Sequence, residues 1–250
     1  DIDKLIEGTN EILSANRNSL QLFDMLHSMR QFDDLTYVHS VNVALIASIL
    51  GQWLKFSEKD IRILTISGLL HDIGKIMIPN EILTKPGKLT VAEYNIMKQH
   101  VNFGYEKVKN QNIDIRIKEA CLLHHEKCDG TGYPFGLKSD HIPAVAKIIA
   151  IADVYDAMTS ARVYRGALCP FEVIDTMYKD AFTKFEPEYI LPFLKNVASS
   201  YINNDVRLSD GRIGKVVLIN ENALSLPIVQ CEDEFIDLSK TRGLTVSAIL

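Results

Sequence analysis

The sequence has 250 residues, of which 47% are hydrophobic and 24% charged, and its formal net charge is −5. A chain of this length can bury one large core, or one core and a small additional unit. The acidic balance argues against broad nucleic-acid binding, because no basic face is available to displace counterions from a polyanion.

No apolar run approaches the roughly 18 residues that a helix needs to cross a bilayer, and no signal peptide opens the sequence, so we expect no membrane span in this chain. The four cysteines form no CxxC pair, and the chain is too long to resemble a disulfide-stapled secreted module. A reducing, cytoplasmic compartment fits these features best. Cys121 is expected in a helix core, and Cys128 is a minor alternative metal ligand because it follows the histidine doublet at 124–125 closely.

Residues 1–30 have apolar positions that approximate a helical stripe, interrupted around Gly8–Asn10. We interpret this segment as one or two amphipathic helices. They either pack against the main domain or form a connector or dimer helix from an upstream module, so a homodimer is one of the predictions. The pattern from 31 to 200 then predicts a mainly α, helical domain.

A strong helical stripe runs from Thr36 to about Leu54, with His39 on its flank. A capping-box-like start at Ser57 opens a second helix, which ends in the adjacent side chains of His71 and Asp72. Two helices joined by a short turn can pack antiparallel. Such packing would bring His39 beside His71.

The stretch Gly68–Lys75 reads GLLHDIGK, so an apolar helical run ends in a histidine and an aspartate. An imidazole beside a carboxylate suits a borderline or hard divalent ion, and a carboxylate can bridge two ions. An isolated His-Asp pair is more often an ordinary helix end. Further candidate ligands elsewhere in the sequence favour a metal site, namely His39, His100, His124, His125 and Asp153.

A capping box at Thr90 predicts a helix over about Val91–Lys109, which carries His100. The next predicted helix, about Ile115–His125, ends in the histidine doublet. Neighbouring residues on a helix diverge by about 100°, so the two histidines of the doublet cannot both point straight into one small site. They can serve two adjacent ions, or one ion and the substrate.

The sequence DGTGYP at Asp129–Pro134 is too rich in glycine for a helix and predicts a shaped loop. Such a loop either gives the backbone freedom beside a ligand or is simply a turn between helices. A helix is then predicted from Pro143 to about Arg162, with Asp153 on an apolar face. A carboxylate there is costly unless it is paired, which makes Asp153 a stronger candidate ligand than most aspartates.

Two more helices are predicted over about Pro170–Thr183 and Pro187–Ser200. From 201 to 250 the pattern changes to short β-type runs, at Gly214–Ile219 and Pro227–Gln230, separated by turn residues. We therefore expect a small, hairpin-based β appendage at the end of the helical domain.

Four separated motifs resemble the HD-GYP family, a subgroup of HD-superfamily metal phosphohydrolases that open cyclic di-GMP. They stand in the family's order, at family-like spacings, and the resemblance spans roughly Thr36 to the end of the chain. It implies an HD-type helical bundle. The motifs are HSVNVA at His39–Ala44, HDIGK at His71–Lys75, HHEKCDGTGYP at His124–Pro134 and IADVYDAMTSARVYR at Ile151–Arg165.

The resemblance implies hydrolysis of cyclic di-GMP to pGpG, or further to GMP. The resemblance also implies that Lys75 and Asp72 are catalytic and that Asp72 bridges the metals. Lys75, Arg162 and Arg165 would hold substrate phosphate or guanine, and Tyr133 would shape the substrate surface or contact a signalling partner. The implied metal ligands are His39, His71, Asp72, His100, His124, His125 and Asp153.

Some family members have a glutamate one helical turn before the first histidine, where it supports a third metal. This chain has Leu35 there, and neither Asp33 nor Asp34 has the helical spacing to replace it. We therefore expect a dinuclear centre of divalent ions, either iron or manganese. Two other functions stay open: hydrolysis of another cyclic dinucleotide, and a sensing or protein-docking module without turnover.

Overall fold

The computed structural model describes the backbone of residues 35–160 and 167–250, and the side chains from Val38 onward. The predictions for residues 1–30, for the side chain of Leu35, and for Arg162 and Arg165 lie outside the described residues. The mainly helical fold with a C-terminal β unit is confirmed. The helices are α3 Leu35–Trp53, α4 Glu58–Leu70, α5 Asn80–Leu83, α6 Val91–Met97, α7 His100–Val108, α8 Ile115–Leu123, α9 Ala144–Thr159, α10 Pro170–Asp180 and α11 Pro187–Ser200, with 3-10 turns η1 Ile73–Met77 and η2 Ser139–His141.

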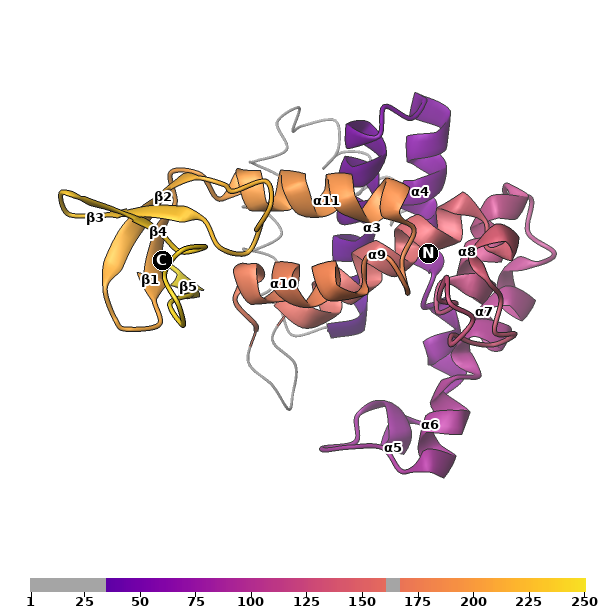
Figure 1. Ribbon diagram of the computed structural model, residues 1–250. Coiled ribbons are helices and arrows are strands. Elements are labelled where there is room, and N and C mark those ends of the chain that lie inside the picture. The colour runs from indigo at the N-terminus through magenta and orange to yellow at the C-terminus, as the bar shows by residue number, and fades with distance from the viewer. Residues whose placement is uncertain (1–34, 161–166) are drawn as a thin grey trace.

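In Figure 1 the sheet lies at one end of the molecule and α7 and α8 lie at the other, while α5 and α6 project from the bundle. Large side chains from α9, α10 and α11 fill the core, where Tyr155, Phe171 and Phe193 are at most 2% exposed. The rings of Tyr155 and Phe193 meet edge to face at 5.2 Å. Within the part of the chain that the structure describes, no helix is long and apolar enough to cross a membrane.

Helices α3 and α4 pack antiparallel at very short range. A Cβ atom on Gly68 would lie 2.5 Å from the Cα of Ala44, so the two backbones touch where both residues are small. At one end of this contact Gly51 faces Leu64, and at the other the rings of His39 and His71 are 5.3 Å apart. The predicted antiparallel pair is confirmed, and its contact places two candidate ligands side by side.

The prediction of one helix over Val91–Lys109 is wrong, because the chain breaks into α6 and α7 before His100. The capping box that opens α6 is present, with the Thr90 and Glu93 side chains each accepting the other residue's N–H. At the break, the Gln99 N–H donates to the Ile96 carbonyl, a tightened turn. This break lets α7 begin directly against Gly74, where any side chain would collide with the His100 backbone.

Helix α9 ends at Thr159, before the predicted limit at Arg162. Ser160 has an extended backbone, and its hydroxyl donates to a carboxylate oxygen of Asp156 one turn earlier. This side-chain bond accompanies the end of the helix. Residues 129–134 form an irregular loop, as their glycine content predicts.

The C-terminal unit is a five-stranded antiparallel sheet of order β4-β3-β2-β1-β5, larger than the expected hairpin unit. The predicted runs correspond to β2 and β3, whereas β1, β4 and β5 were not predicted. The buried side chains of the sheet join the same hydrophobic cluster as the helices. The strands are β1 Asp205–Leu208, β2 Ile213–Leu218, β3 Ile228–Cys231, β4 Glu234–Asp237 and β5 Val246–Ile249.

Candidate metal centre

Seven candidate ligands from five helical segments converge on one buried site. Helix α3 supplies one histidine, the end of α4 supplies the His-Asp pair, and α7 supplies a histidine at its first residue. The doublet follows α8, and α9 supplies an aspartate from its middle. Most of these side chains therefore stand at helix ends. The seven are His39, His71, Asp72, His100, His124, His125 and Asp153.

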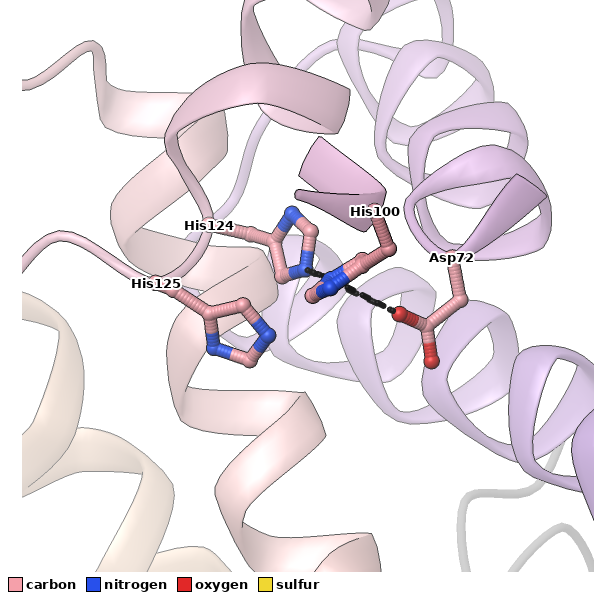
Figure 2. A group of neighbouring side chains, drawn as sticks. All are labelled: Asp72, His100, His124 and His125. Carbon is pink, nitrogen blue, oxygen red and sulfur yellow. Dashed lines mark hydrogen bonds and ion pairs between the residues drawn. The ribbon is translucent and has the colours of Figure 1, made fainter. Parts of the chain in front are cut away.

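Asp72 lies at the middle of this site, with one carboxylate oxygen facing each half. Its Oδ1 lies 3.3 Å from Nε2 of His100 and 3.9 Å from Nε2 of His124. Its Oδ2 lies 3.3 Å from Nε2 of His71 and 3.6 Å from Nε2 of His39. Figure 2 shows the His100 ring between Asp72 and His124. Two ligand groups, Asp72/His100/His124/His125 and His39/His71/Asp72, thus share one carboxylate.

Asp153 is a second carboxylate that faces both halves. Its Oδ1 lies 3.1 Å from Nε2 of His39, and its Oδ2 lies 3.8 Å from Nδ1 of His125. The aspartate that the sequence places on an apolar helix face therefore points into the polar site, which explains how α9 tolerates a buried charge.

The Nδ1 nitrogens of four histidines make hydrogen bonds to groups outside the centre, which leaves the Nε2 atoms of the same rings facing the centre. Nδ1–H of His71 donates to the Gly68 carbonyl at 2.7 Å, that of His100 to the Met97 carbonyl at 2.8 Å, and that of His124 to the Ala120 carbonyl at 3.0 Å. Such outer bonds fix the tautomer and ring orientation of metal-binding histidines.

For His39 the outer partner is Asp156, which the sequence-based prediction missed. The Nδ1–H of His39 donates to Asp156 at 2.7 Å, and the amide of Asn42 donates to the other carboxylate oxygen at 2.9 Å. The available signal was its position three residues after Asp153, on the same face of α9. Asp156 orients the histidine that the sequence left as a lone residue on a helix flank.

Several polar atoms at the centre are buried without a hydrogen-bond partner. They are Nε2 of His39, Nε2 of His71 and Oδ1 of Asp72. An unsatisfied buried polar atom costs about 1–3 kcal/mol, so native structures rarely keep several together without a ligand. These nitrogen and oxygen lone pairs fit divalent ions of borderline character. The site can hold metal.

The charges of the ligands also suit cations. Burial opposes ionisation of Asp72 and Asp153, yet Lys75 and His71 around the first and His39 beside the second hold both pKa values well below the usual range. Burial lowers the pKa of His125 to about 3. Burial would also lower the pKa of His39, but the carboxylates of Asp153 and Asp156 beside its ring raise it to about 9. That ring would release a proton on binding metal.

The remaining predicted site residues lie around this centre. Lys75 Nζ donates to Asp72 Oδ2, and its side chain is 23% exposed. The Tyr133 ring stacks on His125, with centroids 4.7 Å apart and planes at 29°. Among the described residues neither ligand group includes a cysteine, so Cys128 is not part of them. Cys121 is buried and donates to the Leu70 carbonyl, as expected of a core residue.

Comparison with known proteins places this site in a family. The sequence matches the HD domain family over residues 10–189. It is 36% identical over 203 residues to a cyclic di-GMP phosphodiesterase of Pseudomonas aeruginosa, covering 81% of this chain and 49% of the relative. It is 32% identical over 188 residues to a 3'3'-cGAMP-specific phosphodiesterase of Vibrio cholerae, covering 74% of this chain and 36% of the relative.

A solved structure shares the fold. An HDG"Y"P protein from Bdellovibrio bacteriovorus superposes with a TM-score of 0.61 at 21% sequence identity, covering 77% of this chain and 60% of that protein. The chain spans about half the length of the Pseudomonas relative. Because the family match covers more than half of the sequence and includes all seven converging side chains, the chain belongs to the HD domain family, whose members are metal-dependent hydrolases.

Proposed function

We propose that this chain is a metal-dependent phosphodiesterase that hydrolyses cyclic di-GMP to pGpG, or further to GMP, at a dinuclear centre. The observation that carries the proposal is the placement of the Asp72 carboxylate, whose two oxygens face two separate sets of imidazole nitrogens. A carboxylate shared in this way supports a bridging role. We place the activity in residues 31–200, with residues 201–250 as the smaller unit.

The two ligand groups would each hold one ion. Asp72, His100, His124 and His125 form one group, and His39 and His71 join Asp72 in the other. Asp153 lies close to both. A mixed set of nitrogen and oxygen donors suits iron or manganese. When bound, two such ions polarise a phosphodiester and supply a hydroxide nucleophile near neutral pH.

The residues around the centre would bind the anionic substrate. Lys75 is the charged group nearest to the bridging carboxylate, and it is partly exposed, so its ammonium can turn toward a phosphoryl oxygen once Asp72 holds metal. Tyr133 presents an aromatic ring beside His125. We assign phosphate or guanine recognition to Lys75, Tyr133, Arg162 and Arg165.

The decisive experiment uses protein purified without oxygen and loaded with Mn²⁺ or Fe²⁺. It is incubated with cyclic di-GMP or with 3'3'-cGAMP, and the products are separated by chromatography. We expect pGpG from cyclic di-GMP and no product from Asp72→Asn, a variant of equal size whose side chain cannot bridge two cations as a carboxylate does. The absence of cleavage in metal-loaded protein would refute the proposal.

The same experiment separates the two alternatives. Faster cleavage of 3'3'-cGAMP would favour that substrate, a possibility raised by the Vibrio cholerae relative. Tight binding of cyclic di-GMP without turnover would favour a sensing or docking module. A signalling partner at the Asp129–Pro134 loop, a homodimer and a cytoplasmic location stay predictions.

A further inference from the structure

His125 is held differently from the other four histidines of the centre. For those four, Nδ1–H donates to a backbone carbonyl or to Asp156. Nδ1 of His125 lies 3.8 Å from Oδ2 of Asp153, which is too long for a hydrogen bond. Instead, its ring lies between two others: Tyr133 stacks on it at 4.7 Å, and His100 meets it edge to face at 5.1 Å.

The position of Tyr133 is set by a tight return of the chain onto the end of α8. The Tyr133 N–H donates to the His125 carbonyl at 3.2 Å. Just before it, Gly132 packs so closely that a Cβ atom would lie 2.5 Å from the His125 carbonyl oxygen and from the Cα of Glu126. The segment therefore doubles back directly over His125. This return brings the tyrosine ring onto the imidazole.

Glu126, the residue after the doublet, closes the far side of the same loop. Its carboxylate accepts the Phe135 N–H at 2.7 Å through one oxygen and the Leu137 N–H at 2.9 Å through the other. Glu126 is only 3% exposed, and no cationic side chain in the described ranges lies within 4 Å of it. A buried carboxylate is costly unless it is well hydrogen-bonded, so these two backbone donors are its main compensation.

We propose that Glu126 is a positioning residue for the metal centre. By clamping the loop beyond Tyr133, it holds the tyrosine ring against His125 and so orients the one ligand that lacks an outer hydrogen bond. Stacking replaces the hydrogen-bonded outer partner that the other histidines have. This inference rests on the proposed function only in taking His125 as a metal ligand.

The test measures metal binding rather than turnover. Metal-free wild-type protein and Glu126→Gln are dialysed against Mn²⁺ to obtain the number of ions and the affinity for each. The amide keeps the size of the side chain but sets an NH₂ group against one of the two N–H donors. We expect the affinity for one ion to fall by about tenfold, the usual lower cost of losing an outer partner, and the other to stay unchanged.

Glu186→Gln is the matched control. Glu186 accepts hydrogen bonds from the Ser139 hydroxyl at 2.5 Å and from Lys147 at 2.6 Å. It therefore also holds the chain that follows the loop, but among the described residues its side chain makes no hydrogen bond to residues 132–137. The same substitution there should leave both Mn²⁺ affinities within about twofold of wild type, well below the effect of losing an outer partner of a ligand.

Two further variants test whether the effect passes through the ring. Tyr133→Phe keeps the stacking surface and should keep both affinities, whereas Tyr133→Leu should reproduce the tenfold loss. Glu126→Gln and Tyr133→Leu together should then lose no more than either alone, because both remove the same support. The visible spectrum of Co²⁺-loaded protein should change in Glu126→Gln and in Tyr133→Leu, and not in Tyr133→Phe.

Unchanged Mn²⁺ affinities in Glu126→Gln would overturn the inference, and so would additive losses in the double variant or an equal loss in Glu186→Gln. If Glu126→Gln does not fold, Glu126→Asp gives the same test, since the shorter carboxylate reaches only one of the two donors. Wild-type protein that binds two Mn²⁺ ions without cleaving the dinucleotide would instead count against the proposed function alone.

Discussion

The close contact between α3 and α4 ends beside the metal centre, to which both helices contribute ligands, but the two regions bury different kinds of atom. At the contact, the small residues Gly68 and Ala44 bring the two backbones together. Three residues further along α4, His71 opens a region where buried nitrogens and oxygens lack partners. The apolar contact stabilises the bundle. The unpaired polar atoms destabilise the metal-free protein, and a bound ligand would compensate for that cost. Stability and metal binding should therefore be separable by mutation.

The largest effect on stability should come from Gly68→Ala. The added Cβ would meet backbone atoms of α3 at 2.5–2.6 Å, and a backbone cannot move aside as a side chain can. Overpacking costs about 1–3 kcal/mol, and we expect about 3 kcal/mol here even though alanine favours a helix by about 1 kcal/mol. Urea unfolding of the metal-free protein measures the change.

Gly51→Ala is the control for this prediction. Its Cβ would meet the tip of the Leu64 side chain at 2.8 Å, which can rotate away. We expect a change in the free energy of unfolding of less than about 1 kcal/mol, because the gain in helix propensity offsets the crowding. Equal effects at the two glycines would show that backbone contact is not what limits the α3–α4 distance.

Substitutions of metal ligands should have the opposite effect, with metal binding lost and the helical bundle still folded. His71→Ala and Asp72→Ala should each abolish metal retention and hydrolysis while the far-ultraviolet circular dichroism stays that of wild type. Removing Asp72 takes away the oxygen ligand shared by both groups, so both ions should be lost. Metal-to-protein ratios on each variant decide the matter, and two ions still bound in Asp72→Ala would rule out the bridging role.

A smaller effect is expected from Arg162→Ala, which should leave both the bundle and the metal content intact. A charged hydrogen bond to phosphate contributes about 1.5–3 kcal/mol, or roughly ten- to hundredfold in affinity. Binding of cyclic di-GMP should weaken by that factor. Arg212→Ala, in the turn between β1 and β2 where the arginine pairs with Asp210, is the control and should bind as wild type does. An unchanged Michaelis constant and turnover number would take Arg162 out of the site.

The smallest effect concerns Glu93 on the projecting α6, which belongs to neither region. Its hydrogen bonds from Lys85 and Thr90 lower its pKa from 4.5 to about 2. Because the folded-state pKa is the lower one, this contribution to stability is fully present above about pH 4.5 and is lost as the pH falls through about 2. The difference in unfolding free energy between wild type and Glu93→Gln should therefore shrink between pH 6 and pH 3.

For this last prediction, Glu81→Gln is the comparison. Glu81 is exposed on the neighbouring α5, and its carboxylate accepts no hydrogen bond from another described side chain. A parallel shrinkage in both variants would trace the pH dependence to net charge rather than to the bonds of Glu93.

The sequence was informative where residue type and local pattern are enough to identify a helix or a candidate ligand. Histidines and aspartates in a mainly apolar chain are conspicuous, and helix signals such as the capping box at Thr90 are local. The helices and the residues of the centre could therefore be named in advance. The break before His100 could not, because it depends on Gly74 from a different segment packing against the start of α7. The short strands β1, β4 and β5 were missed because their alternation becomes clear only once they pair.

By itself, the sequence determined the helical class of the fold, the set of seven candidate ligands and the family, since these follow from composition, periodicity and motif order. Only the tertiary structure decided which oxygen of Asp72 faces which histidines, and that Asp156 stands behind His39. The physical reason is that these relations join atoms from helices far apart in the chain. Their geometry depends on how tightly those helices pack, down to the contact of Gly68 with Ala44.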